Sequence, residues 1–350
     1  MRDGDVLILN GQEVQTLLAE REKDLIDAVR RAYIAHAAGN SALPHSIFLR
    51  LPEEHGNRII ALPAYLGDEF GIAGIKWVSS FPANLERGLD RASAVVILNS
   101  TLTGRPEAII EGSIINAKRT AASAALAAQC LLNGKRATRV GILGAGVINF
   151  EIVRFLLAAL PEITAIDVLD LDQSRVDHFK EKCKATFRKL EVESVNDVST
   201  LLGNSPLISI ATTAIQPHIS DLSACQPGSA ILHISLRDLS PEVILACDNV
   251  VDDIGHVCRA QTSMHLAEQL TGNRDFIRCT LADVLRGDAP VKQNEDSITV
   301  FSPFGVGVLD IAVGKLVRDL GVEQGHGMLL NSFFPDSWSN GNHRPAAQEQ

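Results

Sequence analysis

Residues 139–149 read "RVGILGAGVIN" and decide the fold, because Gly144 and Gly146 stand between an apolar strand-like run and a helical segment. In dinucleotide-binding folds the first glycine allows a tight turn, and the second lets backbone amides approach a pyrophosphate at a helix N-terminus. Asn149 stands where that motif has a third glycine, so helix and strand are expected to pack less closely there. The motif predicts a dinucleotide site, and a glycine-rich turn that binds no nucleotide is the alternative.

The acid that such a site needs follows on the next predicted strand, "ITAIDVLDLD". Asp170 lies 24 residues after Gly146, close to the spacing of about 20 at which an acid binds the ribose hydroxyls. A carboxylate at this place repels a 2′-phosphate, so the spacing predicts NAD rather than NADP as the cofactor. Asp167 and Asp172 compete for the role, but Asp167 lies inside the strand and Asp172 is expected to begin the next helix.

Strands and helices alternate around this motif, in the segments "TRVGILGAG", "FEIVRFLLAAL", "ITAIDVLDLD", "SRVDHFKEKCKATF", "PLISIAT", "SAILHIS" and "DNVVDDI". The alternation is typical of a doubly wound parallel sheet. An alanine-rich helix is predicted before it, over residues 113–132. Near the end of the chain, "SITVFSPFGVGVLDIAVGKLVRDL" predicts a strand, a turn and a helix, and we expect this last helix to return to the domain that begins the chain.

The first hundred residues have a different pattern. Apolar residues recur at helical spacing over residues 11–38, and Gly39 and Asn40 form a helix stop. Short strand-like runs follow, separated by Pro, Gly, Asn and Asp, and they read "SIFLRL", "RIIALPAY", "GIAGIKWV" and "ASAVVILN". These runs predict an antiparallel or mixed sheet.

Composition narrows the class of partner. The 350 residues suffice for two domains, and the net charge of −10 with a pI near 5.5 argues against nucleic acid or an anionic membrane. A small molecule is the expected partner. The six cysteines form no Cys-x-x-Cys pair, so we expect reduced thiols and no metal site. The N-terminal apolar run has four residues and no run is long enough to span a membrane, so a cytoplasmic location is expected.

Three cations stand in apolar surroundings, namely Arg50 in "SIFLRLP", Lys76 in "GIKWV" and Arg119 in "AKRTAAS". Lys76 interrupts a strand that should be buried, and burying an ammonium is costly unless an anion meets it. The three together suggest a ligand that carries a carboxylate. The alternative for Lys76 is a strand-end lysine whose charged head reaches solvent.

Asp238, in "HISLRDLSPE", directly follows a strand of the predicted parallel sheet. That position lies at the carboxyl edge of the sheet, where ligands of this fold bind, so Asp238 is a candidate acid for chemistry. An aspartate that only caps a turn before Ser-Pro is the alternative.

The stretches "GIKWVSSFPAN", "DRASAVVILN", "KRTAA", "GILGAG", "ISLRD" and "VFSPFGVGVLDIA" resemble, in order, the ornithine cyclodeaminase and mu-crystallin family over nearly the whole chain. The resemblance implies an α/β protein with a Rossmann doubly wound parallel sheet and an α+β domain for substrate binding and dimerisation. It implies that residues 1–119 and 304–350 form this second domain, and residues 120–303 the NAD-binding domain. A homodimer is therefore expected.

The same resemblance implies roles for individual residues. Arg50, Lys76 and Arg119 match residues that hold the substrate's α-carboxylate, with Lys76 also polarising the reacting carbon, and Asp238 matches the catalytic acid. The expected cofactor contacts are Ser93, Arg119, Thr120, Gly144, Gly146, Val147, Ile148, Asp170, Ala211, Thr212 and Ser235.

Within the family, "RASAVVILN" and "GIKWV" most resemble the branch that oxidises N-((2S)-2-amino-2-carboxyethyl)-L-glutamate with NAD. That branch releases 2-oxoglutarate and the 2,3-diaminopropionate used in siderophores and peptide antibiotics. The alternatives are an ornithine cyclodeaminase, an imine reductase or alanine dehydrogenase, and NAD(P)H and ligand binding without turnover as in mu-crystallin. Ile60 stands where cyclodeaminases have a glutamate for the distal ammonium of ornithine, which weakens the first alternative.

Overall fold

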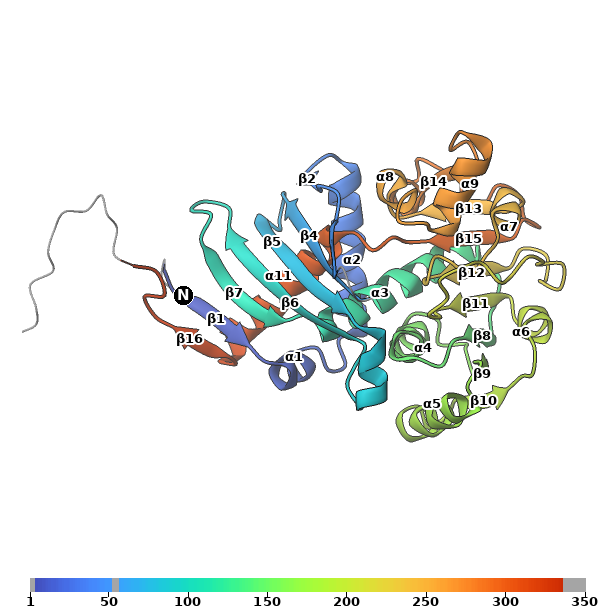
Figure 1. Cartoon of the computed structure of the whole chain (residues 1–350), viewed down its shortest axis with the longest axis horizontal. Helices are drawn as coiled ribbons and strands as arrows, with labels where there is room; N and C mark the ends of the chain where they lie inside the picture. Colours follow the sequence, from blue (N-terminus) through green and yellow to red (C-terminus); the bar gives the residue numbers. More distant parts are fainter. Residues whose placement is uncertain (1–3, 52–56, 336–350) are drawn as a thin grey trace, which may run out of the picture.

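The computed structural model describes residues 4–51 and 57–335, and Figure 1 shows two sheets with helices between and around them. Among these residues the first sheet has the strand order β16-β1-β7-β6-β5-β4-β2, with β3 also paired to β4. β1 and β7 are parallel and the other neighbours are antiparallel, which confirms the predicted mixed sheet. Its strands are β1 (Val6–Leu9), β2 (Ser41–Ala42), β3 (Ile47–Arg50), β4 (Arg58–Leu66), β5 (Ile72–Ser80), β6 (Ala92–Ser100), β7 (Pro106–Glu111) and β16 (Met328–Leu330).

The second sheet is parallel throughout its described strands, in the order β10-β9-β8-β11-β12-β15-β13-β14. The chain reverses its direction of travel across the sheet between β8 and β11, which is the crevice where ligands of doubly wound sheets bind. The predicted Rossmann sheet is therefore confirmed. Its strands are β8 (Arg139–Leu143), β9 (Ala165–Leu169), β10 (Glu191–Ser194), β11 (Leu207–Ile210), β12 (Ala230–His233), β13 (Asp248–Val251), β14 (Ile277–Thr280) and β15 (Thr299–Ser302).

The helices surround these sheets. They are α1 (Gly11–Leu17), α2 (Glu22–Ala37), the 3₁₀ turn η1 (Pro82–Arg87), α3 (Ser113–Leu131), α4 (Val147–Ala159), α5 (Gln173–Thr186), α6 (Val198–Asn204), α7 (Pro241–Leu245), α8 (Ile254–Val257), α9 (Ser263–Thr271), α10 (Leu281–Arg286) and α11 (Gly307–Gln324). The segment predicted as helical over 11–38 is split in two, because Glu20 has a φ of 57° between α1 and α2. The proposed domain boundaries after residues 119 and 303 stay a prediction.

α3 and α11 connect the two parts of the chain. α3 is alanine-rich, and its small side chains let α2, α4 and α11 pack directly against it. α11 packs on β4, β5 and β6 of the first sheet, as expected for a last helix that returns to the start of the chain. A Cβ at Gly314 would lie 3.2 Å from Val96 Cγ1, so this helix approaches the sheet closely. α11 thereby carries its side chains to the inner face of the sheet.

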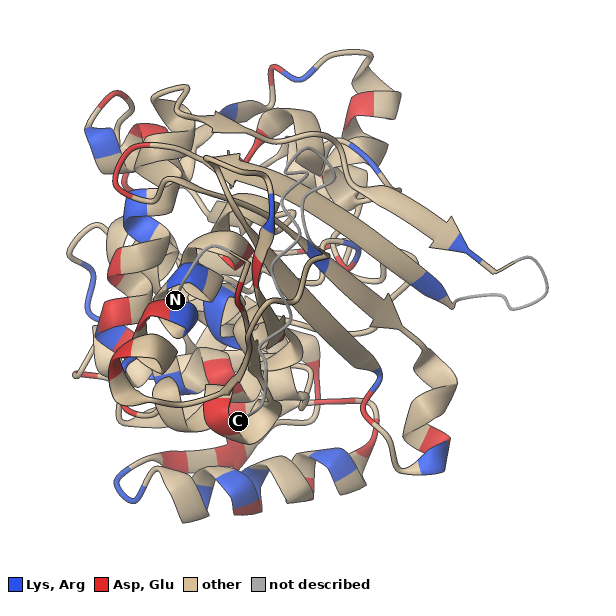
Figure 2. Cartoon of the chain, turned by 90° about the vertical axis from the view of Figure 1, so that its left-hand side faces the viewer, with Lys and Arg blue, Asp and Glu red and all other residues tan. Residues whose placement is uncertain are grey.

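Strand register assigns residues of the first sheet to its two faces. Lys76 pairs with Leu62 and Val96, so these three side chains share the inner face, toward α11. A second row, Ile47, Ala61, Trp77 and Val95, runs across β3 to β6 on the other face. We call this the outer face, and it also carries Leu49 and Tyr65. Figure 2 shows these strands with little charge along their length.

No helix within residues 4–51 and 57–335 is both long and apolar enough to cross a membrane.

Candidate active site between the two sheets

The glycine-rich turn has the geometry of an anion cradle. Gly144 has a φ of +97°, and a Cβ there would overlap the carbonyl oxygen of Ala211, so no other residue fits without strain. A Cβ at Gly146 would meet nothing within 4 Å among the described residues, which leaves room for a ligand. Gly146 is also the N-cap of α4, and no side chain caps the first amides of this helix. These features fit a dinucleotide pyrophosphate.

Asn149 replaces the missing glycine with hydrogen bonds. Its side chain is buried, and its Nδ2 donates to the carbonyls of Leu143 at 2.9 Å and Gly144 at 2.7 Å. Its Oδ1 accepts from Ser209 Oγ at 2.7 Å. The amide thus joins the end of β8, the glycine-rich turn and β11. Asn149, which departs from the glycine motif, therefore links the two strands on either side of the crevice.

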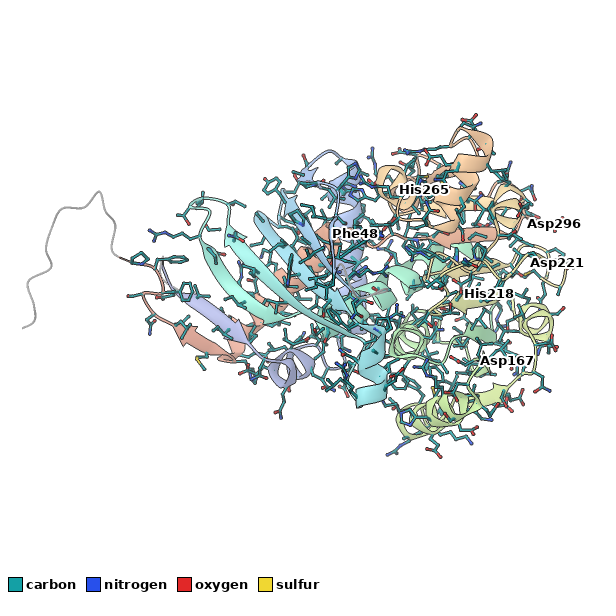
Figure 3. The ribbon with its side chains drawn as sticks, in the orientation of Figure 1. Phe48, Asp167, His218, Asp221, His265 and Asp296 are labelled. Atoms are coloured by element: carbon teal, nitrogen blue, oxygen red, sulfur yellow. The ribbon has the colours of Figure 1, made fainter. Side chains whose placement is uncertain are left out.

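The three acids after β8 have different surroundings. Asp170 Oδ2 accepts the Ala145 N–H at 2.7 Å, so this carboxylate lies beside the glycine-rich turn. Asp167 is buried, pairs with Arg139 and accepts from Asn204; Figure 3 labels it among β8 to β10. The third acid, at position 172, is the N-cap of α5, as predicted. Asp170 therefore has the geometry for ribose hydroxyls.

If Asp170 selects NAD, Asp170→Ala should narrow the preference for NAD over NADP, because the variant no longer repels a 2′-phosphate. Titration of the wild type and the variant with each oxidised cofactor measures the ratio of dissociation constants. Asp177→Ala, an exposed acid on α5, is the matched control. An unchanged ratio in Asp170→Ala would remove the proposed role.

Lys76 lies at the centre of a second cluster, on the inner face of the first sheet. Its side chain is 2% exposed, and its Nζ lies 2.8 Å from Asp310 Oδ2 and donates to Asn116 Oδ1 at 2.8 Å. Arg119 binds the same two residues, donating from Nε to Asp310 Oδ1 at 2.8 Å and from Nη2 to Asn116 Oδ1 at 2.7 Å. β5, α3 and α11 thus each contribute to one network. We call these four residues the cation clamp.

Asp310 corrects the interpretation of the buried lysine. The sequence predicts a ligand as the source of the anion, but α11 supplies a buried carboxylate that meets both Lys76 and Arg119. Burial lowers the pKa of Lys76 most, Arg119 lowers it further and Asp310 opposes them, which leaves this pKa at about 8. One carboxylate between two cations still leaves the clamp a net positive charge. The only sequence signal for Asp310 is an acid inside the apolar run "VGVLDIAV".

The loop before α11 fixes Arg119 from the other side. Gly305 has a φ of +88°, and a Cβ there would lie 2.7 Å from Arg119 Nη1. Asp252, at the end of β13, accepts the backbone N–H groups of Phe304 at 2.8 Å and Gly305 at 2.7 Å. The second sheet therefore holds the loop that packs against the clamp.

Asp238 is buried just after β12 in a cluster of polar side chains. The hydroxyls of Thr212 and Ser235 donate to its two oxygens. His218 Nε2 lies 3.2 Å from Oδ1, and His233 Nε2 lies 3.3 Å from Oδ2 and accepts the Asp238 N–H at 3.2 Å. Burial by itself would raise the pKa of Asp238, but the contacts with His233, Ser235 and Thr212 outweigh it and the pKa is strongly lowered. The carboxylate is therefore ionised at neutral pH.

The two histidines beside Asp238 are not predicted by the sequence. His233 is fully buried, whereas the side chain of His218 is 43% exposed and is labelled in Figure 3 near the second sheet. Neither stands in a recognisable motif. Thr212 and Ser235, expected as cofactor contacts, have Asp238 as a partner in this structure.

The remaining predicted residues lie as follows. Ser93 on β6 shares a hydrogen bond of 2.8 Å with Ser79, and Thr120 donates to the carbonyl of Asn116 at 2.7 Å. Arg50 ends β3 and is exposed. Three of them lie beside the glycine-rich turn. Val147 and Ile148 begin α4, and the carbonyl of Ala211 faces Gly144.

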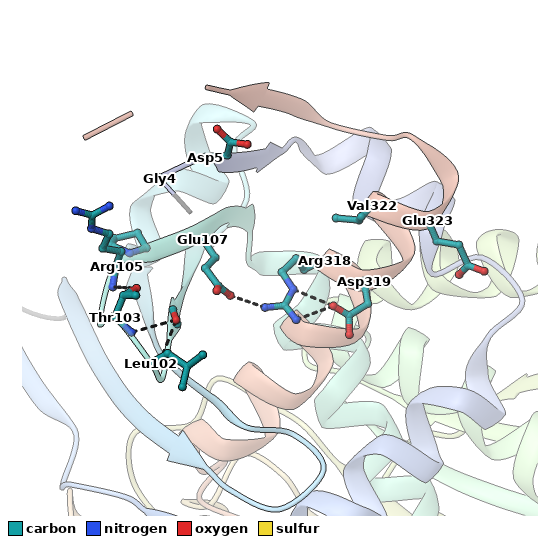
Figure 4. A pocket seen from close by; sticks show the side chains of 12 residues that line it. Gly4, Asp5, Leu102, Thr103, Arg105, Glu107, Arg318, Asp319, Val322 and Glu323 are labelled. Atoms are coloured by element: carbon teal, nitrogen blue, oxygen red, sulfur yellow. Dashed lines mark hydrogen bonds and ion pairs between the residues drawn. The ribbon is translucent and has the colours of Figure 1, made fainter. Parts of the chain in front are cut away.

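A cavity of about 610 Å³ opens elsewhere, where β1, β7 and the end of α11 meet (Figure 4). Two arginines, Arg105 and Arg318, line it together with several acids, and Arg318 lies 2.7 Å from both Glu107 and Asp319. It contains none of the predicted site residues. We therefore place the candidate site at the crevice rather than in this cavity.

The doubly wound sheet, the glycine-rich turn and Asp170 together define a dinucleotide-binding α/β protein. The model of the ornithine cyclodeaminase/mu-crystallin family matches residues 6–325. The chain belongs to this family.

Individual relatives cover almost the whole chain. The N-((2S)-2-amino-2-carboxyethyl)-L-glutamate dehydrogenase of Staphylococcus aureus is 28% identical over 335 residues, 94% of this chain and 99% of that protein. The alanine dehydrogenase of Archaeoglobus fulgidus is 27% identical over 340 residues, with 94% and 99% covered. A solved structure of Thermococcus litoralis Δ1-pyrroline-2-carboxylate reductase with NADH and L-proline is 25% identical, has a TM-score of 0.85, and matches 92% of this chain and 99% of that one.

Proposed function

We propose that this protein oxidises N-((2S)-2-amino-2-carboxyethyl)-L-glutamate. With NAD⁺ and water, the secondary amine gives 2-oxoglutarate, 2,3-diaminopropionate, NADH and a proton. The observation that carries the proposal is the net positive cation clamp, which suits the α-carboxylate of an amino-acid substrate. The similarity to the Staphylococcus aureus dehydrogenase supports the same substrate.

The chain is an NAD-dependent enzyme of the ornithine cyclodeaminase/mu-crystallin family. Proteins similar to this chain are named dehydrogenases, reductases and a cyclodeaminase. Gly144, Gly146 and Asp170 would hold the dinucleotide, and the nicotinamide supplies a hydride acceptor when bound.

The chain's own residues divide the remaining work. Lys76 and Arg119 bind the α-carboxylate next to the reacting carbon and are held rigid by Asp310 and Asn116. In the proposed reaction the Asp238 carboxylate accepts the proton of the substrate amine and then orients the water that hydrolyses the imine. His218 Nε2 lies beside its carboxylate, and His233 accepts the backbone N–H of Asp238 and so holds the turn in place.

Position 60 argues against a diamine substrate. Ile60 on β4 pairs with Val78 on β5, lies on the same face as Lys76 and offers no charge to a distal ammonium. The methylenes of a glutamyl arm would instead pack on it. Ornithine cyclodeamination is therefore the less favoured activity.

The proposal is tested by following NADH absorbance with N-(2-amino-2-carboxyethyl)glutamate and ornithine in parallel, and by identifying products by mass. We expect 2-oxoglutarate and 2,3-diaminopropionate from the first compound and no reaction with the second. Proline and ammonia from ornithine, without 2-oxoglutarate from the first compound, would move the protein to the cyclodeaminases. Alanine and proline serve as further substrates for the dehydrogenase and reductase alternatives.

We also propose that two copies associate through the outer face of the first sheet. Ile47 is 67% exposed and Trp77 43% exposed, and they belong to the apolar row across β3 to β6. Exposed apolar rows of this kind mark interaction surfaces. Sedimentation of the purified chain is expected to give about twice the 37.7 kDa of one chain, and a monomer mass would contradict the proposal.

A further inference from the structure

Arginines gather at one end of the first sheet, beyond the cation clamp. Arg50 and Arg58 are register partners on β3 and β4, and Arg58 is in turn paired with Ser80 on β5. Arg91, just before β6, donates from Nε to Ser80 Oγ at 3.3 Å. Three guanidinium groups therefore converge on the ends of neighbouring strands.

A fourth arginine comes from the second sheet. Arg237 immediately precedes Asp238, and its Nη2 donates to the carbonyl of Ala260 at 2.7 Å. Burial lowers the pKa of Arg237 most, and Arg58 lowers it further. Burial also lowers the pKa of Arg58, and the charge of Arg50 lowers it further. Burial lowers the pKa of Arg91 in the same way, and there the charge of Arg58 is the next cause. Arg58 and Arg237 thus interact electrostatically, and the neighbouring Asp238 carboxylate opposes the lowering of the Arg237 pKa.

These arginines lack the partners that other arginines of the chain have. Arg119, Arg139 and Arg278 each pair with a buried carboxylate. Within residues 4–51 and 57–335, by contrast, no carboxylate forms an ion pair with Arg58, Arg91 or Arg237, and Arg58 Nε is buried without a hydrogen-bond partner. Bringing unpaired cations together out of water is costly unless an anion joins them.

We propose that Arg58, Arg91 and Arg237 form a second anion subsite, which binds the substrate carboxylates that lie away from the reacting carbon. The inference rests on the proposed function and names the residues that would select an amino acid with two or more carboxylates.

The register supports the distance that such a substrate needs. Arg58 lies four residues from Leu62, the register partner of Lys76, so Arg58 and Lys76 share the inner face. Four residues of strand span about 13 Å, and both side chains are long enough to approach each other from these positions. One end of an extended dicarboxylate then meets the clamp and the other meets the subsite.

The other source of an anion is the dinucleotide pyrophosphate. The surroundings of Arg91 are partly consistent with pyrophosphate binding. Arg175 on α5 also lowers the pKa of Arg91, and Arg175 lies near Asp170 in the sequence. Arg58 shares a face with Lys76, and Arg237 is adjacent to Asp238, so these two belong on the substrate side. The test therefore uses Arg58 and Arg237.

The experiment is calorimetric titration of the NADH-loaded full chain with 2-oxoglutarate and, separately, with pyruvate. Arg58→Gln and Arg237→Gln should each weaken 2-oxoglutarate binding roughly 10- to 100-fold, as for a lost hydrogen bond to a charged group. Pyruvate and NADH affinities should not change. Arg188→Gln, an exposed arginine between α5 and β10, is the matched control. Arg58→Lys keeps the charge and should restore part of the affinity.

Equal loss of NADH affinity would assign the arginines to the dinucleotide and overturn the proposal, and so would unchanged 2-oxoglutarate binding in folded variants. Thermal unfolding identifies variants that fail to fold, and Arg58→Lys then carries the test. The two proposals fail separately. If the wild type oxidises N-(2-amino-2-carboxyethyl)glutamate and both Gln variants do so at the same rate, only the subsite is refuted. Selective loss of 2-oxoglutarate binding in an enzyme that does not oxidise this amine would refute the proposed substrate alone.

Discussion

Asp238→Asn should lower kcat by about 10²- to 10⁴-fold, the usual cost of losing a positioned acid-base group. The substitution keeps the shape of the side chain but removes the negative charge that accepts the substrate proton. It also places an amide N–H where Thr212 or Ser235 now donates, so one of these hydroxyls must turn away. Steady-state rates with the substrate that the wild type oxidises measure the effect.

NAD binding should be almost unchanged in Asp238→Asn, because the glycine-rich turn and Asp170 are untouched. Asp221→Asn, an exposed acid of the same domain, is the control for charge. Wild-type kcat in Asp238→Asn would show that Asp238 only stabilises the turn after β12.

Lys76→Met should abolish turnover, since the methionine has similar length and no charge for the α-carboxylate. Asp310 keeps Arg119 as a partner, so the buried acid is not left unpaired and the variant should fold. The wild type adds a pH signature. Lys76 has a pKa of about 8, so kcat/KM should fall as the pH rises through that value and the ammonium loses its proton.

Asp310→Asn tests the same signature without removing the lysine. Asp310 raises the pKa of Lys76, so its loss should move the alkaline fall of kcat/KM to lower pH. Asp319→Asn, on the exposed side of α11, should leave the profile in place. Identical profiles for wild type and Asp310→Asn would mean that a group other than Lys76 titrates.

The fold follows largely from local sequence signals. Gly144 needs a positive φ, and the strand and acid that follow it recur at the spacing of one known fold, so the second sheet is predictable from residues 139–172. The break between α1 and α2 is not, since Glu20 adopts its left-handed conformation without a glycine or proline to announce it.

The site was only partly predictable, because its partners are distant in sequence. Lys76 and Asp238 stand out locally, one as a charge in an apolar strand and the other after a strand of a parallel sheet. Asp310 does not stand out, since it meets Lys76 only because α11 packs against β5. The arginines at positions 58, 91 and 237 likewise become a group only through strand register and the approach of the second sheet.

The pairing of Lys76 with Asp310 also has a consequence for biosynthesis. The ribosome makes Lys76 234 residues before Asp310, an interval of roughly 12–47 s at about 5–20 residues per second. All strands of the second sheet leave the ribosome before α11 does. During translation the nascent chain therefore carries an unneutralised Lys76 and an uncovered sheet until its last helix emerges, and the domain begun first is the last to be finished.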